Sequence, residues 1–186
     1  MVTGGRAMVD CLRREGVQHV FGIPGTQNLG VIDALRDAPD VKFVLTRHEQ
    51  GAAFMAYGFA RASGRPGVVT ATEGPGVTNL ATGVAAAFKG FVPMITITGT
   101  QEAAIRERDT SQQIDQVSFL GPITKWAYEI PTANKVAGSD AQGLSSRAGR
   151  PLRASSRRGL ARRVGGRDRE RTMGAGIVSS HRAARL

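Results

Sequence analysis

Two hydrophobic patterns alternate along the first 136 residues of the chain. Apolar residues spaced three and four apart, which mark one face of an amphipathic helix, predict helices over residues 7–12, 29–35, 49–62 and 77–88. Short β-branched runs bounded by glycine and proline, which are typical of buried strands, predict strands over residues 17–22, 42–46, 67–72 and 93–98. This alternation predicts an α/β fold, in which helices cover both faces of a parallel sheet.

The same architecture predicts where a ligand binds. Right-handed crossovers between parallel strands bring all strand-to-helix loops to one edge of the sheet, and α/β proteins bind their ligands at that edge. The residues that directly follow each predicted strand are therefore the first candidates for function.

The pattern ends after Val136. Residues 137–186 contain eight large apolar residues, no aromatic residue and no lysine. So little apolar surface cannot offset the entropy lost on folding, and we expect a disordered tail. A basic segment with arginine but no lysine is also what a GC-rich gene encodes out of frame, so we hypothesise a frameshift near Val136.

The net charge of +10 at first suggests a nucleic-acid-binding protein. The tail, however, carries twelve arginines against three acidic residues, a net charge of +9, and residues 1–136 carry a net charge of only +1. Arginine pairs such as Arg157-Arg158 would bind phosphate without sequence preference, but the tail has no aromatic residue for base stacking. Nucleic-acid binding is therefore an alternative that we rank below an enzymatic function, and we do not expect a nucleic-acid partner.

Cys11 is the single cysteine of the chain. No intrachain disulfide is possible, so a reducing cytoplasm is the simplest location, and its apolar neighbours predict a small core residue. No apolar run approaches the roughly 20 residues of a membrane span, and the start of the chain lacks the pattern of a signal peptide. We expect a cytoplasmic protein without a membrane partner.

The candidate chemistry lies in three strand-to-helix junctions and one later segment. In chain order the residues are Pro24, Gly25, Thr26, Glu49, Gly74, Pro75, Gly76, Asn79 and Gln112. Each also has a structural explanation, because glycine and proline mark turns and a carboxylate stabilises a helix N-terminus. His48 is expected to have a structural role, and we expect no metal site because no histidine has a partner at metal-ligand spacing.

The third junction also resembles a dinucleotide-binding fingerprint. Gly74-x-Gly76-x-x-Asn79 lacks the third glycine of that motif and follows the third predicted strand instead of the first. Asp40 is the candidate acid for contacting a ribose. A NAD-binding oxidoreductase is therefore an alternative from another class.

Taken together, the segments resemble a known family. Gly22-x-Pro24-Gly25, Arg47-His48-Glu49-x-Gly51-Ala52, Gly74-Pro75-Gly76-x-Thr78-Asn79 and a strand from Pro93 to Thr98-Gly99 are similar to the N-terminal, pyrimidine-binding domain of thiamine-diphosphate enzymes of the acetolactate (acetohydroxyacid) synthase type. The resemblance covers residues 4–136.

The resemblance implies that Glu49 activates thiamine diphosphate. In this family the corresponding carboxylate hydrogen-bonds N1′ of the aminopyrimidine and favours the imino tautomer, which removes the C2 proton of the thiazolium. The family also gives roles to the other candidates. Pro24, Gly25 and Thr26 approach the active centre, Gly74, Pro75, Gly76 and Asn79 line the aminopyrimidine, and Gln112 aligns with a glutamine near the substrate.

Two departures bear on the substrate. Ser111 stands where synthases usually have phenylalanine, and Glu73 replaces a small residue, which is expected to change the substrate pocket. The segment from Ser111 to Gln116 is also similar to that of oxalyl-CoA decarboxylases. The substrate class is therefore a 2-oxo acid or an acyl-CoA, for a decarboxylase, carboligase or acyl-transferring member of the family.

The chain has no Gly-Asp-Gly motif. In this family a separate C-terminal domain holds the diphosphate and its Mg²⁺ through that motif, and a middle domain holds FAD in some full-length members. The resemblance thus implies a truncated chain that is inactive alone, and a homodimer or homotetramer in the full-length form, because the active site forms between subunits.

Overall fold

The computed structural model describes residues 2–102, 105, 108–136 and 177–180. Its sheet has the strand order β2-β1-β3-β4-β6-β5. Strands β2, β1, β3 and β4 are parallel, with Val20 beside Phe43, Val20 beside Val68 and Val68 beside Ile95. The strands are β1 (His19–Gly22), β2 (Lys42–Leu45), β3 (Gly67–Ala71), β4 (Met94–Thr98), β5 (Ala127–Glu129) and β6 (Ile177–Ser180). The predicted parallel sheet is confirmed for the four strands that the sequence indicated.

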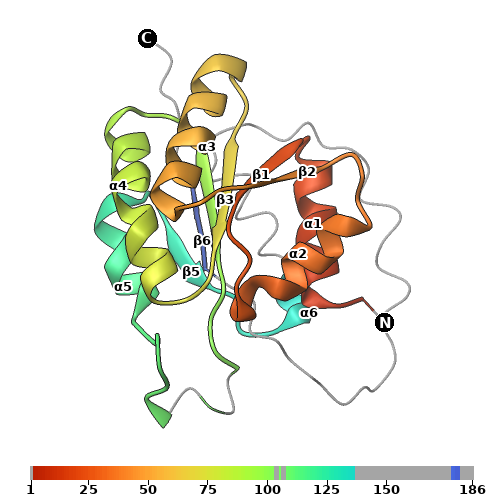
Figure 1. The fold of residues 1–186 in the computed structure, drawn as a ribbon, viewed down its shortest axis with the longest axis vertical. Helices are drawn as coiled ribbons and strands as arrows, with labels where there is room; N and C mark the ends of the chain where they lie inside the picture. Colours follow the sequence, from red (N-terminus) through yellow and green to blue (C-terminus); the bar gives the residue numbers. More distant parts are fainter. Residues whose placement is uncertain (1, 103–104, 106–107, 137–176, 181–186) are drawn as a thin grey trace.

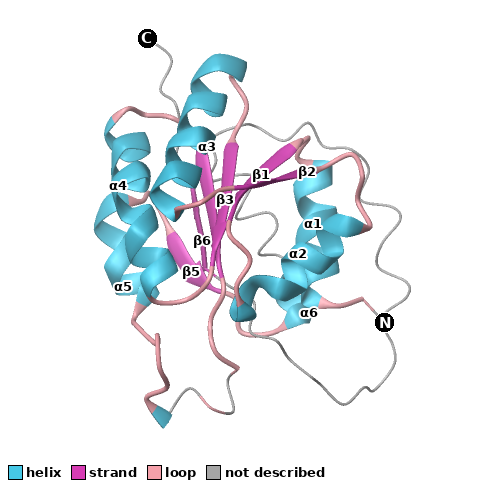
Figure 2. Ribbon diagram, in the orientation of Figure 1, coloured by secondary structure: helices cyan, strands magenta, loops and turns pink. Residues whose placement is uncertain are grey.

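Helices cover both faces of this sheet, as predicted (Figures 1 and 2). The long helices are α1 (Gly4–Arg14), α2 (Leu29–Arg36), α3 (Glu49–Ser63) and α4 (Pro75–Lys89). The shorter ones are η1 (Thr26–Asn28), α5 (Gln116–Leu120), η3 (Gly121–Ile123) and α6 (Ala133–Val136). None of the helices described by the structure is long and apolar enough to cross a membrane.

The core has two main layers because successive residues of a buried strand point to opposite faces. Val68 of β3 packs with α1 and α2, and its neighbour Val69 packs with α3 and α4. Cys11 is half-buried at the edge of the first layer, where its Sγ donates to the carbonyl of Val136 over 3.6 Å. Burial raises the pKa of this thiol, which agrees with the structural role expected for it.

Helices α3 and α4 pack at very short range. A Cβ atom at Gly83 would lie 2.4 Å from Cβ of Ala53, so the contact requires a residue without a side chain at this position. The alanine-rich sequence of α3 therefore has a packing role, because it lets the two helices approach closely.

Strand β6 lies within the tail that the sequence predicted to be disordered, so that prediction is wrong for these four residues. Ile177–Ser180 lies antiparallel between β4 and β5, with Ser179 beside Thr96 and Val178 beside Tyr128. Backbone groups on the edges of β4 and β5 need hydrogen-bond partners, and the β-branched pair Ile177-Val178 suits a strand. The sheet is therefore mixed at this end. The rest of the tail lies outside the described residues. This part includes the arginine clusters and the sequence that follows the proposed frameshift.

Candidate functional site

The loops at the carboxyl ends of the four parallel strands meet at one edge of the sheet, as the sequence predicts. Helix η1 follows β1, the start of α3 follows β2, and the turn Gly74-Pro75-Gly76 follows β3. The segment that carries Gln112 follows β4.

Glu49 and Asn79 form a direct pair at this edge. Glu49 is the first residue of α3 and is half-buried, and Asn79 lies in the second turn of α4. Nδ2 of Asn79 donates a hydrogen bond to Oε2 of Glu49 over 2.9 Å. Because an amide donor holds one carboxylate oxygen, the orientation of the Glu49 side chain is defined by the protein.

The turn before α4 packs closely beside this carboxylate. Gly76 is buried, and a Cβ atom there would lie 3.6 Å from Oε1 of Glu49 and 3.1 Å from Cγ2 of Thr72. Gly74 has φ +65°, a left-handed conformation that favours glycine, and Pro75 is the exposed first residue of the helix. A larger residue at position 76 would therefore press against Thr72 directly beside the carboxylate of Glu49.

The turn Pro24-Gly25-Thr26 is held in the same region by hydrogen bonds and by a close packing contact. The amide of Gly25 donates to Oδ1 of Asn28 over 2.7 Å, and Nδ2 of Asn28 donates to the carbonyl of Ile23 over 3.0 Å. A Cβ atom at Gly25 would lie 2.4 Å from Cβ of Thr72. Pro24 and Thr26 flank this contact and are exposed.

Three residues that shape this turn are not among the candidates that the sequence pattern indicated. Asn28 is 2% exposed, and the hydroxyl of Thr72 donates to Oε1 of Gln27. An asparagine three residues after a Pro-Gly turn is a recognisable turn signal and could have identified Asn28. Gln27 and Thr72 meet only in the folded chain.

Gln112 meets the turn before α4 from its other side. Its side chain is exposed and its φ is +74°. A Cβ atom at Gly74 would lie 2.2 Å from the carbonyl oxygen of Gln112. The structure therefore places Gln112 against Gly74, whereas Asn79 and Gly76 are the candidate residues beside Glu49.

His48 and Asp40 have structural roles in the described part of the chain. Nδ1 of His48 accepts a hydrogen bond from the amide of Gln50 over 3.2 Å and so caps α3. Asp40 pairs with Arg13 over 2.8 Å, which lowers the pKa of Asp40. Because Asp40 precedes β2, it lies at the amino end of that strand, on the wrong edge for contacting a ribose. The structure thus gives no support to the dinucleotide interpretation.

The described residues include no group of three or more His, Cys, Asp or Glu side chains that could hold a metal ion.

Comparison with known proteins agrees with the motifs. Residues 2–119 match the family described as "Thiamine pyrophosphate enzyme, N-terminal TPP binding domain". The chain is 47% identical over 132 residues to an acetolactate synthase of Arthrospira platensis, covering 69% of this chain and 23% of that protein. It is 42% identical over 134 residues to an acetolactate synthase of Bacillus subtilis, covering 72% and 23% of the two chains.

A third relative is the mitochondrial acetolactate synthase catalytic subunit of Saccharomyces cerevisiae, 44% identical over 135 residues, covering 73% of this chain and 20% of that protein. The chain thus spans less than a quarter of the length of these relatives. The family match confirms the resemblance inferred from the motifs. The chain belongs to the thiamine pyrophosphate enzyme family and contains its N-terminal TPP-binding domain.

Proposed function

We propose that residues 1–136 are the pyrimidine-binding domain of an enzyme that decarboxylates 2-oxo acids and transfers or joins the remaining carbon unit, as a transferase or lyase related to acetolactate synthases. The observation that carries this proposal is the Glu49–Asn79 pair beside Gly76. The named relatives support the reaction class, and the family match over residues 2–119 supports a domain that lies within residues 1–136.

The residues at this edge fit thiamine diphosphate, which supplies the electron sink for decarboxylation when it is bound. Asn79 holds Oε2 of Glu49, so Oε1 would share a proton with a ring nitrogen of the aminopyrimidine. The backbone of Gly74 and Gly76, together with Pro75, would line the ring, because a side chain at position 76 would fill the space beside Oε1. Pro24, Gly25 and Thr26 would close the same edge.

Gln112 would contact the substrate from the other side of the turn. A 2-oxo acid is the first candidate. An acyl-CoA, as in oxalyl-CoA decarboxylases, is the second candidate. It is favoured by Ser111, a small and exposed residue next to Gln112 where synthases usually have phenylalanine.

The remaining parts of the enzyme would come from other domains. We assign the diphosphate, Mg²⁺ and any FAD to domains outside this chain, and we propose a homodimer or homotetramer for the full-length enzyme. Phe54 and Met55 of α3, which are 42% and 49% exposed, support a partner surface on that helix. The chain alone would then be inactive. The cytoplasmic location inferred from the single cysteine stays a prediction.

A chimeric enzyme tests the proposal. Residues 1–136 would replace the matching segment of the Arthrospira platensis relative, and CO₂ release from 2-oxo acids would be measured with and without thiamine diphosphate. We expect cofactor-dependent release, and Glu49→Gln should lower it by about 100-fold or more, since the proton-sharing group is lost. A folded chimera whose activity does not change with Glu49→Gln would contradict the proposal.

Asp33→Asn is the matched control, because Asp33 is an exposed acid paired with Arg36 on α2. Its activity should equal that of the unmodified chimera. The 186-residue chain should release no CO₂ under the same conditions, and measurable turnover would show that the proposed inactivity is wrong.

A further inference from the structure

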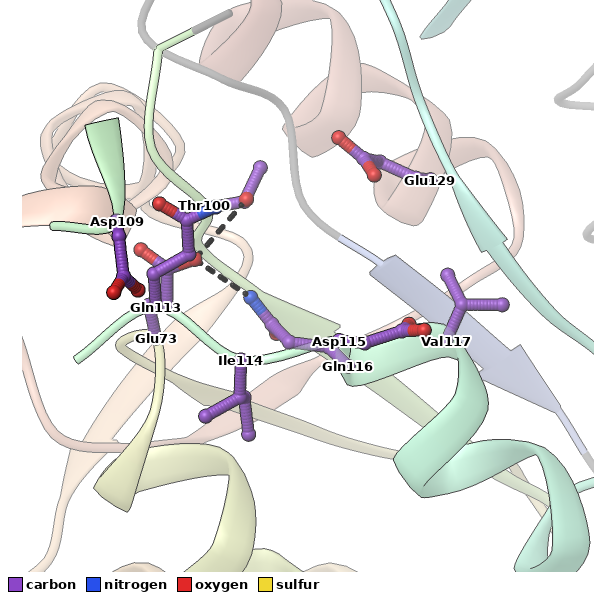
Figure 3. A pocket seen from close by; sticks show the side chains of 9 residues that line it. All are labelled: Glu73, Thr100, Asp109, Gln113, Ile114, Asp115, Gln116, Val117 and Glu129. Atoms are coloured by element: carbon purple, nitrogen blue, oxygen red, sulfur yellow. Dashed lines mark hydrogen bonds between the residues drawn. The ribbon is translucent and has the colours of Figure 1, made fainter. Parts of the chain in front are cut away.

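Glu73 is a buried carboxylate directly before the turn that leads into α4. Its side chain is 1% exposed. Oε1 accepts hydrogen bonds from the hydroxyl of Thr100 over 3.3 Å and from Nε2 of Gln116 over 3.5 Å (Figure 3). Nε2 of Gln116 also donates to the carbonyl of Gly99 over 2.8 Å. Burial of a carboxylate is costly without hydrogen-bond donors, and Thr100 and Gln116 provide donors for Oε1.

These partners stand at the two ends of the segment that carries Gln112. Gly99 and Thr100 directly follow β4, and Gln116 is the first residue of α5. Glu73 therefore joins the beginning and the end of this segment to the turn before α4. The adjacent Gly74 touches the backbone of Gln112 itself, because a Cβ atom there would lie 2.2 Å from the Gln112 carbonyl oxygen.

The backbone of Gln112 also needs external support. Its φ of +74° is uncommon for a residue with a side chain. Such conformations persist when the surrounding structure holds them, and they are concentrated at functional sites. The hydrogen bonds of Glu73 are placed to supply this support.

The side chain of Glu73 lines a cavity of about 320 Å³, whose lining includes Thr100, Gln116, Asp109 and Asp115 (Figure 3). Neither Glu49 nor Asn79 is among the residues that line this cavity. The sequence analysis expected the charge of Glu73 to change the substrate pocket. In the structure its hydrogen bonds to Thr100 and Gln116 point to an indirect effect, through the segment that carries Gln112.

We propose that Glu73 is a positioning residue, whose hydrogen bonds to Thr100 and Gln116 fix the segment from Asp109 to Asp115 and so hold Gln112 at the ligand edge. This inference rests on the proposed function, because that function gives Gln112 its role toward the substrate. The pair Glu73 and Gln116 would then tune substrate selection without touching the substrate.

The test uses the full 186-residue chain without cofactor. Hydrogen–deuterium exchange of the backbone amides from 109 to 116 and the side-chain amide NMR signal of Gln112 are compared between wild type and variants. Glu73→Ala should accelerate this exchange roughly tenfold, because the hydrogen bonds from Thr100 and Gln116 are lost, and should shift the Gln112 signal. Glu73→Gln should stay close to wild type, since its amide oxygen accepts from the same donors.

Two further measurements separate positioning from a general loss of structure. The side-chain amide signal of Asn79, which reports on the Glu49 pair, should not move in any of these variants. Asp109→Asn removes a charge from the same cavity and should leave the exchange unchanged. If Glu73→Ala does not fold, Thr100→Val removes one donor, and we expect roughly threefold faster exchange.

The inference would be overturned if Glu73→Ala exchanged at the wild-type rate and left the Gln112 signal unmoved. If Glu73→Ala does not fold, the same result in Thr100→Val would overturn it. An equal effect of Asp109→Asn would also overturn it, because the cavity charge and not the hydrogen bonds would then be responsible. These readouts need no cofactor. A negative result in the exchange and NMR measurements would leave the role proposed for Glu49 intact. A negative result in the chimera experiment would not change the exchange and NMR results.

Discussion

Asn79 holds the carboxylate of Glu49 by a hydrogen bond of 2.9 Å from its Nδ2 to Oε2, which links the first turn of α3 to the second turn of α4. Only one carboxylate oxygen is used in this pair, and the other lies next to the position where Gly76 has no side chain. The protein therefore orients Oε1 toward the backbone of Gly76 instead of leaving the side chain to rotate in solvent. This orientation is the feature that a proton-sharing role of Glu49 requires.

Asn79→Asp should destabilise the domain at neutral pH by about 1–2 kcal/mol, because it replaces the donor with a second carboxylate facing Glu49. Repulsion raises the pKa of one member of such a pair above its unfolded value, so the folded state binds more protons than the unfolded state. The loss of stability should thus grow as the pH rises above about 5 and shrink as it falls. Urea denaturation of both proteins between pH 4.5 and 7.5 measures the difference.

Asn79→Ala is the control for that experiment, since it removes the hydrogen bond without adding a charge. Its loss of stability should change less with pH. Equal pH dependence of the two variants would mean that the Asn79 and Glu49 side chains are not neighbours in solution.

Gly83→Ala and Gly58→Ala should have opposite effects on stability. A Cβ atom at Gly83 would lie 2.4 Å from Cβ of Ala53, and we expect a loss of about 1–3 kcal/mol from overpacking of α3 against α4. Gly58 lies in the exposed interior of α3 with no atom within 4 Å of a new Cβ. Alanine at this position should stabilise the helix by about 0.5–1 kcal/mol. Chemical denaturation of the two variants measures both effects, and a destabilising Gly58→Ala would show that this face of α3 is covered.

The parallel part of the fold could be predicted because it depends on local patterns. The run from Gly67 to Ala71 is uniformly apolar or β-branched, and Gly64 and Gly74 bound it, so its strand and the turn after it were both visible in the sequence. Glu49 and Asn79 could be identified from family motifs. Their direct pairing depends on how α3 and α4 pack, which no local pattern contains.

The elements that the sequence did not reveal depend on distant contacts. Strand β5 has three residues, and it pairs with β6 some fifty residues further along the chain. Asn28 bonds to Thr70 over a separation of 42 residues, and Gln116 bonds to Glu73 over 43. Glu73 could be recognised as an unusual residue at its position. The direction of its side chain was not predictable, because a carboxylate before a glycine turn can face either the substrate or the interior.

Asp115 should support the start of α5 in a pH-dependent way. Its carboxylate accepts a hydrogen bond from the amide of Ser118 over 3.0 Å. Hydrogen bonding by the side chain of Ser118, and after it by this amide, lowers the pKa of Asp115. A carboxylate with a lowered folded-state pKa stabilises the fold above its unfolded pKa, and this contribution is lost as the pH falls below about 4. An NMR titration of Asp115 should therefore have its midpoint below the usual range for aspartate.

Asp115→Asn is the matched variant, because asparagine caps a helix about as well but does not titrate in this range. The stability difference between wild type and Asp115→Asn should be constant at neutral pH. Below about pH 4 the wild type should lose stability relative to Asp115→Asn. Asp115→Ala should lose about 1 kcal/mol at neutral pH through the missing cap. A midpoint of Asp115 in the ordinary aspartate range would contradict the bond to Ser118.

The exposed apolar side chains of α3 should cause the isolated chain to self-associate. Phe54 and Met55 are 42% and 49% exposed, and the neighbouring Gly51 and Gly58 are exposed on the same helix. A face of this kind on a helix of a multidomain enzyme family is expected to be covered in the full-length protein. Sedimentation velocity should thus show concentration-dependent association of the wild-type chain. Phe54→Ser/Met55→Ser should weaken it at least about tenfold, since most of the buried apolar area of two side chains is lost.

Phe91→Ser provides the control for this surface. Phe91 is 64% exposed, more than either residue of α3, but it lies in the turn after α4. If exposure alone drove association, this variant would also weaken it clearly, because Phe91 is more exposed than either residue of α3. If the α3 face is the contact surface, Phe91→Ser should associate like the wild type. The comparison thus decides between a defined partner surface on α3 and nonspecific apolar aggregation, and only the first agrees with a domain that completes its site against another subunit.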